Sequence, residues 1–142
     1  MFTSKASDPL LVYIADDDDD MRALVGETLR ANGCATVEAR DGAELLGLLH
    51  LALADPELCP DVLVADVKMP RLSGLGVLSA LKHAGWSLPT VMITVVSDDS
   101  IHTVAKRLGA VGVLHKPFDP DDLVIAVRNA KAAYDLHPLS GR

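Results

Sequence analysis

Five polar side chains stand at the ends of apolar runs in this sequence, and their types point to one kind of chemistry. They are Asp16, Asp17, Asp66, Thr94 and Lys116. Carboxylates gathered in one place repel one another, so they need a cation. Oxygen ligands with few other donors suit Mg²⁺, whose coordination a phosphate often completes. An ammonium and a hydroxyl could hold oxygens of that phosphate, and one aspartate could then be the nucleophile in phosphoryl transfer.

The apolar runs themselves predict the elements that bring these side chains together. Runs at 10–15, 62–65, 90–96 and 111–114, with a shorter candidate at 35–39, are typical of strands buried on both faces. Helical patterns fill the gaps, so strand and helix alternate five times, which predicts an α/β sandwich with a parallel sheet. Ligands bind outside the carboxyl ends of the strands in such sheets, where the five side chains would converge.

Each predicted helix carries a stripe of apolar residues at helical spacing. The stripes are Met21, Leu24, Val25 and Leu29; the leucine-rich stretch 43–53; Leu75, Leu78 and Leu81; Ile101, Val104, Ala105 and Leu108; and Leu123, Val127, Ala130 and Tyr134. Asp41 and Gly42 open the second helix, residues 97–100 offer caps for the fourth, and Gly109 is placed to end it.

Length and composition fit one soluble domain. The chain has 142 residues, of which 49% are hydrophobic and 23% charged. The formal net charge of −7 includes the acidic run 16–20, which argues against nucleic acid or an anionic membrane surface as a partner. No apolar run approaches a membrane span and no signal peptide is expected. Cys34 and Cys59 form no CxxC pair, so we expect reduced thiols and a cytoplasmic protein. The predicted domain covers 9–135, between tails at 1–8 and 136–142.

The motifs, taken in order, resemble those of response-regulator receiver domains of two-component signalling. The matching stretches are Ile14-Ala15-Asp16-Asp17-Asp18, Asp66-Val67-Lys68-Met69-Pro70 with Ser73-Gly74, Ile93-Thr94, and Lys116-Pro117-Phe118. The resemblance covers residues 9–134. It implies a flavodoxin-like, doubly wound (βα)5 fold, with a five-stranded parallel sheet of order 2-1-3-4-5 and helices on both faces.

The resemblance also implies roles for individual residues. Asp66 would accept the phosphoryl group. Asp17 would bind Mg²⁺ directly, Asp16 would act largely through water, and Asp66 and the backbone carbonyl of Lys68 would complete the metal ligands. Thr94 would bond the phosphoryl group and move on activation. Lys116 would pair with a phosphoryl oxygen, ahead of a cis bond to Pro117.

The function implied is a phosphorylation-dependent signalling receiver rather than a metabolic enzyme. Its phosphodonor would be a sensor histidine kinase or a phosphotransfer protein, and its effector would bind the face formed by the fourth helix, fifth strand and fifth helix. Charged candidates on that face are His102, Lys106, Arg107, Arg128 and Lys131. The sequence does not distinguish a stand-alone receiver from a piece of a longer regulator or hybrid kinase.

Three residues depart from the family pattern. Val113 stands where the family usually has Tyr or Phe, so the usual aromatic readout is in doubt. Val95 replaces a small residue after Thr94, and we expect it to crowd the phosphate pocket. Lys68 places a cation two residues after the acceptor. Lys68, Val95 and the apolar Val96, two residues past Thr94, favour slow loss of the phosphoryl group.

The acidic residues near the start of the chain admit other interpretations. Asp16, Asp18 and Asp20 have EF-hand spacing, but Met21 stands where that calcium loop needs glycine. Asp18, Asp19 and Asp20 suit the first turn of a helix through its dipole.

Two other functions remain open. One is a pseudo-receiver that only binds partners, which the intact acceptor set disfavours. The other is a haloacid-dehalogenase-type phosphatase using Asp16-x-Asp18 and Asp98-Asp99. Lys116 follows those acids, whereas that class places its lysine before them.

Overall fold

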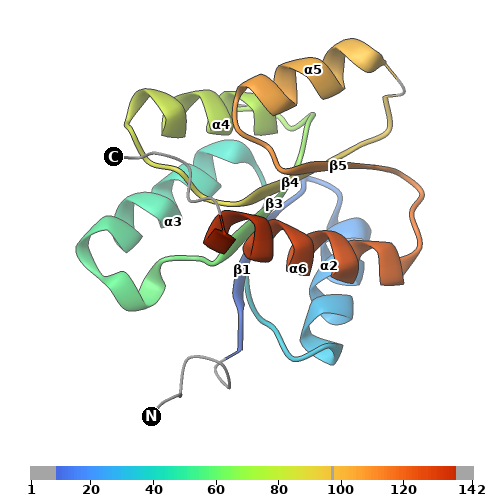
Figure 1. The fold of residues 1–142 in the computed structure, drawn as a ribbon, viewed down its shortest axis with the longest axis horizontal. Helices are drawn as coiled ribbons and strands as arrows, with labels where there is room; N and C mark the ends of the chain where they lie inside the picture. The colour runs from blue at the N-terminus through green and yellow to red at the C-terminus, as the bar shows by residue number, and fades with distance from the viewer. Residues whose placement is uncertain (1–8, 97, 137–142) are drawn as a thin grey trace.

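The computed structural model describes residues 9–96 and 98–136 (Figure 1). Five parallel strands form one sheet in the order β2-β1-β3-β4-β5. The strands are β1 (Leu11–Ala15), β2 (Ala35–Ala39), β3 (Val62–Asp66), β4 (Thr90–Thr94) and β5 (Gly112–His115). The predicted fold class and strand order are therefore confirmed.

The helices lie in two layers, one on each face of the sheet (Figure 1). They are α2 (Asp19–Ala31), α3 (Gly42–Ala54), α4 (Gly74–His83), α5 (Asp99–Arg107) and α6 (Pro120–Leu136), with a short 3-10 turn, η1 (Pro56–Leu58). Helices α2 and α6 share one core with the sheet, and α3, α4 and α5 share the other. The predicted fourth and fifth helices correspond to α5 and α6.

Burial on both faces explains why the central strands β1 and β3 are apolar up to the site residues. Along β1, Val12 and Ile14 pack towards α2 and α6, whereas Tyr13 and Ala15 pack towards the opposite layer. Side chains of a strand alternate between its two faces, so a strand with helices on both sides carries no polar face.

Local sequence signals set most helix ends. The carboxylates of Asp18, Asp41 and Asp98 accept amide hydrogen bonds at the starts of α2, α3 and α5, and Ser73 does so at α4. Gly109 has a φ of 108° just past α5, a backbone conformation that glycine adopts without strain. Asp18 to Asp20 therefore serve the start of a helix, as predicted.

Four large apolar residues of the predicted stripes are exposed in the structure. Leu24 on α2 is 43% exposed, Leu51 and Leu53 near the end of α3 are 60% and 64% exposed, and Val104 on α5 is 41% exposed. These side chains lie outside both buried clusters of the core.

The element ends differ slightly from the predicted ones. Strand β4 ends at Thr94, two residues before the end of the predicted apolar run. Helix α6 continues through Leu136, one residue into the predicted tail. The predicted tails at 1–8 and 137–142 lie outside the described residues.

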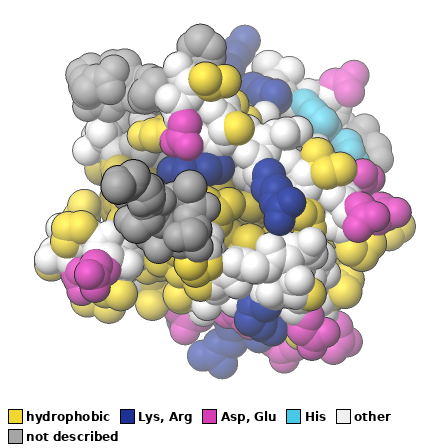
Figure 2. All heavy atoms as spheres, turned by 60° about the horizontal axis from the view of Figure 1, so that its bottom comes forward, with side chains coloured by type: hydrophobic (Ala, Val, Ile, Leu, Met, Phe, Trp, Pro, Cys, Tyr) yellow, Lys and Arg dark blue, Asp and Glu magenta, His cyan; other side chains and the backbone are white. Residues whose placement is uncertain are grey.

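On the face of the molecule shown in Figure 2, Lys and Arg side chains form several small separate groups among apolar and acidic side chains. In the part of the chain that the structure describes, no helix is long and apolar enough to cross a membrane.

Candidate functional site

The predicted site residues meet at one edge of the sheet because the strands are parallel. Asp66 is the last residue of β3 and Thr94 the last of β4, while Asp16 directly follows β1 and Lys116 directly follows β5. The amide of Lys116 donates to the carbonyl of Thr94 at 2.8 Å, which ties the ends of β4 and β5 together.

Three carboxylates gather at this edge. Asp16, Asp17 and Asp66 each offer an oxygen, and these three atoms lie within 4.8 Å of one another. Asp16 and Asp66 are buried, whereas Asp17 is exposed. A set of hard oxygen donors with one side open to solvent fits Mg²⁺, which keeps several of its waters when bound.

Lys116 is the cation that faces this cluster. Its Nζ lies 2.6 Å from Asp66 Oδ2 and 3.0 Å from Asp16 Oδ2. Burial opposes the charge of Lys116, but the ionic hydrogen bonds to Asp66 and Asp16 outweigh burial and raise the pKa of the ammonium. The following peptide bond, to Pro117, is cis, as the resemblance implies.

Asp16 is held mainly by its neighbours' backbone and by Lys116. Burial raises the pKa of Asp16, and the charge of Asp66 acts in the same direction. The amide of Asp18, which donates to Asp16 Oδ1 at 2.9 Å, and the ammonium of Lys116 oppose that rise. A cation bound beside Asp16 would favour its charged form.

The phosphoacceptor candidate has both oxygens engaged. Asp66 Oδ1 accepts from the amide of Lys68 at 3.0 Å, and Oδ2 accepts from Lys116. Thr94 is buried, and its hydroxyl oxygen accepts from the amide of Val96 at 3.0 Å. The Thr94 hydroxyl thus stands on the strand next to Asp66.

An open hollow of about 410 Å³ lies beside the cluster, lined by Asp17, Lys68, Met69, Pro70 and Ser73. It gives a small phosphodonor room to approach.

Val95 does not line this hollow. Its side chain is 66% exposed, because the chain leaves the sheet after Thr94. The expectation that Val95 crowds the phosphate pocket gains no support from this hollow and stays a prediction.

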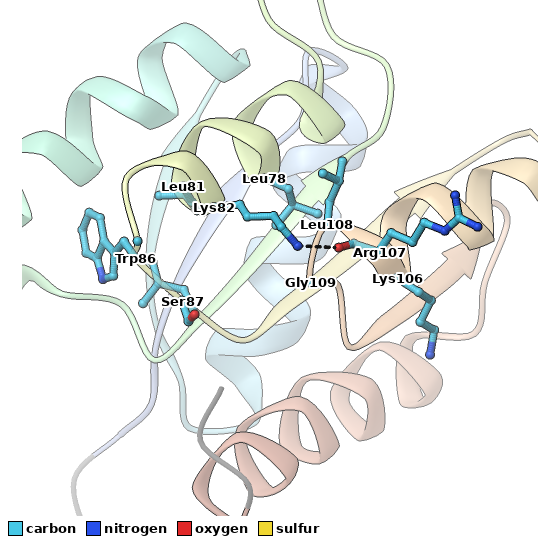
Figure 3. Close-up of a pocket in the computed structure, with 11 residues that line it drawn as sticks. Leu78, Leu81, Lys82, Trp86, Ser87, Lys106, Arg107, Leu108 and Gly109 are labelled. Carbon is cyan, nitrogen blue, oxygen red and sulfur yellow. Dashed lines mark hydrogen bonds between the residues drawn. The ribbon is translucent and has the colours of Figure 1, made fainter. Parts of the chain in front are cut away.

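A second hollow, of about 400 Å³, lies at the opposite edge of the sheet, between the C-terminal ends of α4 and α5 (Figure 3). Leu78, Leu81 and Leu108 line it, and Lys82 reaches across to donate to the carbonyl of Arg107 at 3.0 Å. Cations at helix C-termini are favoured by the helix dipole, and in Figure 3 the side chain of Arg107 extends away from the hollow.

One contact near the site had no sequence signal. The ring of His115 stacks on that of His102 from α5, with centroids 5.1 Å apart and planes 26° apart. His115 Nε2 is buried and has no hydrogen-bond partner among the described residues. Val113, two residues earlier on β5, packs in the same layer as α5. His115 thus lies two residues closer than Val113 to the end of β5 at which Lys116 stands.

Two of the four acids on which the phosphatase alternative depends, Asp18 and Asp98, serve as helix caps. Asp18 accepts from the amides of Asp20 and Met21 at the start of α2. Asp98 accepts from the amide of Ser100 at the start of α5. Neither belongs to the cluster of carboxylates that could share a metal.

Fold and site together define a receiver domain, and the comparison with known families agrees. Residues 12–128 match the response regulator receiver domain family, and the chain belongs to that family. Receiver domains of this family are signalling proteins of two-component systems rather than classical enzymes. They interact with histidine kinases and output domains, and they generally use Mg²⁺ at the acidic pocket.

Several relatives and solved structures are similar to this chain. The DNA-binding transcriptional regulator NtrC of Escherichia coli (strain K12) is 35% identical over 124 residues, which are 87% of this chain and 25% of that protein. Response regulator MprA of Mycobacterium sp. (strain KMS) is 33% identical over 120 residues, covering 84% of this chain and 50% of that protein. The chain thus spans half or less of the length of these relatives.

Among solved structures, the receiver domain of Francisella response regulator 1452 matches with a TM-score of 0.79 and 27% identity. That match covers 87% of this chain and 98% of the other. The chemotaxis protein CheY4 of Vibrio cholerae matches with a TM-score of 0.75 and 28% identity, covering 86% and 98%.

Proposed function

We propose that this protein accepts a phosphoryl group on Asp66 from a phosphohistidine and then changes conformation to control a partner or an output domain. The donor would be a sensor histidine kinase or a phosphotransfer protein, and the location cytoplasmic. The observation that carries the proposal is the contact of Lys116 with Asp66, beside three carboxylates that share one open site.

The transfer exchanges one bond for another. An oxygen of the Asp66 carboxylate forms an O–P bond while the P–N bond of the donor breaks. The imidazole leaves with the electron pair and takes up a proton from solvent. Because the acceptor is an anion approaching an anionic group, neutralisation of charge is the main task of the site.

The residues of this chain divide that task. Lys116 would follow the transferred group and pair with one of its oxygens, and the Thr94 hydroxyl would donate a hydrogen bond to another. Mg²⁺ bound to Asp16, Asp17, Asp66 and the carbonyl of Lys68 would neutralise charge on the phosphoryl oxygens. Each of these interactions strengthens as charge collects on the phosphoryl group.

The conformational signal would pass towards the face made by α5, β5 and α6. Thr94 is paired with His115 across β4 and β5, and His115 stacks on α5. Lys106 and Arg107 are exposed at the end of α5.

Other charged candidates on that face already have partners. Arg128 donates to the carbonyl of Asn32, and Lys131 pairs with Asp61 and Asp135. Lys106 also donates, to the carbonyl of Val111 at 3.3 Å. Arg107 is therefore the stronger candidate for contact with an effector.

The test is labelling with a small phosphodonor. In acetyl phosphate or phosphoramidate with Mg²⁺, we expect one added phosphoryl group per chain by intact mass, mapped to Asp66 by peptide analysis. The Asp66→Asn variant should show none while keeping its circular dichroism spectrum. Asp99→Asn, an exposed acid on α5, is the matched control and should label like the parent.

The possible results separate the alternatives. Equal labelling of the Asp66→Asn variant at another residue would overturn Asp66 as the acceptor. A parent chain that is never labelled would favour the pseudo-receiver, which only binds partners.

A further inference from the structure

The loop that follows the phosphoacceptor contains an unusual turn. We call residues 67–73 the acceptor loop. Within it, Arg71 has a φ of 69°, and it is the one residue other than glycine with a positive φ in the described part of the chain. The amide of Leu72 donates to the carbonyl of Pro70 at 2.7 Å, which closes a three-residue turn around Arg71. Turns of this kind with a positive central φ are rare and strained.

A buried carboxylate from another element holds this turn. Arg71 donates to Asp41 Oδ2 from Nε at 3.0 Å and from Nη2 at 2.8 Å. The other oxygen, Asp41 Oδ1, accepts from the amide of Glu44 at 2.8 Å and caps α3. Asp41 is 8% exposed. One carboxylate thus fixes both the start of α3 and the acceptor loop.

The backbone around the turn is packed against its neighbours. A Cβ atom at Gly42, the first residue of α3, would overlap the carbonyl oxygen of Leu72. A Cβ atom at Gly74, the first residue of α4, would overlap the carbonyl oxygen of Asp66. The acceptor loop therefore runs in backbone contact with α3 at one point and with the end of β3 at another.

Residues on both sides of the turn form the wall of the open hollow. Lys68, Met69 and Pro70 precede or enter the turn, Ser73 follows it, and all four line the hollow with Asp17. The amide of Lys68 donates to Asp66 itself. The position of the turn therefore sets where Lys68 lies relative to the carboxylates.

We propose that Arg71 is a positioning residue, whose bridge to Asp41 holds the acceptor loop in the strained turn that keeps Lys68 beside the carboxylate cluster. This proposal rests on the proposed function for its metal-binding consequence. Strain at a turn persists only where the surrounding structure enforces it, and here the enforcing contact is the guanidinium on a buried carboxylate.

Mg²⁺ affinity distinguishes this role from a general effect of charge. Arg71 is a cation near a cation site, so if only charge mattered, its removal would strengthen Mg²⁺ binding. If the bridge positions the loop, removal of Arg71 weakens Mg²⁺ binding, because the Lys68 carbonyl is no longer held in place. The two effects have opposite signs.

The experiment compares the parent with Arg71→Ala, Arg71→Gly, Arg71→Lys and Arg40→Ala. Mg²⁺ affinity is measured by amide chemical shifts in an NMR titration, and exchange of the Leu72 and Gly74 amides is measured without Mg²⁺. Arg40 is the matched control, since it is an exposed arginine next to Asp41 that lies 4.0 Å from Glu44. Arg71→Gly tests the loss of the bridge without the cost of a positive φ.

We expect Arg71→Ala to raise the Kd for Mg²⁺ by about tenfold, the lower end of what losing a partner of a ligand residue costs metal sites. The Leu72 and Gly74 amides should exchange faster than in the parent. Arg71→Gly should show the same direction of change, Arg71→Lys should recover part of the affinity, and Arg40→Ala should not raise the Kd.

Two results would overturn the positioning role. One is an Arg71→Ala or Arg71→Gly variant that binds Mg²⁺ as tightly as the parent or more tightly. The other is unchanged exchange at Leu72 and Gly74. A parent that binds no Mg²⁺ would overturn the proposed function as well, so the two failures are distinguishable.

Discussion

At the site, one ammonium faces three carboxylates. Lys116 contacts Asp16 and Asp66, while Asp17 stands exposed at the edge of the cluster. Buried charges are costly unless they are paired, and this set has one more buried carboxylate than it has cations. The imbalance is consistent with the proposed Mg²⁺ site, and burial raises the pKa of Asp16.

The exposed member of the cluster gives the clearest test of metal binding. Asp17→Asn should raise the Kd for Mg²⁺ by about tenfold or more, since opposite charges about 4 Å apart interact by ~1–4 kcal/mol near a protein surface. Asp20→Asn, an exposed acid in the first turn of α2, should leave the Kd nearly unchanged. Isothermal titration with MgCl₂ measures both. Equal affinity of the parent and Asp17→Asn would place the metal elsewhere.

The buried cap of α3 predicts a dependence of stability on pH. The amide of Glu44, and then the guanidinium of Arg71, hold the pKa of Asp41 below its usual range. A carboxyl with a lowered pKa stabilises the fold above its unfolded pKa, near 4, and that stabilisation is lost as the pH falls through the folded pKa. Asp41→Asn should therefore be less stable than the parent at pH 7, and the difference should shrink below about pH 4.

Urea unfolding of the parent and Asp41→Asn at neutral and acid pH measures this difference. Asp99→Asn is the control, because its carboxylate is exposed. If the difference in free energy of unfolding between the parent and Asp41→Asn grew towards acid pH, the predicted direction would be wrong.

At the scale of elements, glycine destabilises one helix and is required for the packing of another. Gly47 lies on the exposed side of α3 with open space where a Cβ would stand, whereas the Cβ position of Gly74 is filled by the carbonyl of Asp66. Gly47 only weakens α3, whereas Gly74 permits α4 to start against the end of β3.

Alanine substitution separates the two cases. Gly47→Ala should stabilise the protein by about 0.5–1 kcal/mol, the usual gain in an exposed helix interior. Gly74→Ala should destabilise it by ~1–3 kcal/mol, as overpacking does, and should slow phosphorylation because the end of β3 must shift. Chemical unfolding and labelling by acetyl phosphate measure the two effects. A Gly74→Ala variant with parental stability and labelling would show that the backbone yields without cost.

For the whole molecule, metal binding and folding are linked. The three carboxylates come from β1 and β3 ends that are adjacent only in the folded sheet. A ligand that binds only the folded state stabilises it, by about 2.7 kcal/mol when its concentration is one hundred times the Kd. We therefore expect Mg²⁺ to raise the free energy of unfolding of the parent in proportion to the logarithm of its concentration.

Thermal or urea unfolding across a series of MgCl₂ concentrations, at constant ionic strength, measures this effect. Asp17→Asn should need about tenfold more Mg²⁺ for the same gain, in step with its weaker binding. If the same Mg²⁺ concentrations raised the free energy of unfolding of the parent and of Asp17→Asn equally, the stabilisation would be a general salt effect and not binding at this site.

Much of the fold follows from local patterns in the sequence. Continuous apolar runs marked four of the five strands, because strands covered on both faces have no polar side, and a shorter stretch marked β2. Polar residues at the ends of those runs marked the candidate site, because parallel strands end together at one edge. Asp18 and Asp41 marked helix starts, since their side chains bond nearby amides within the same segment.

The tertiary structure alone decided which of these residues touch. The bridge from Arg71 to Asp41 joins residues 30 apart in the sequence, and the stack of His115 on His102 joins a strand to a helix. Likewise, Val95 is exposed because the chain leaves the sheet after Thr94. Leu24 is exposed because it lies on a side of α2 that does not face the core. Such contacts depend on how elements pack in space, and local periodicity carries no information about that packing.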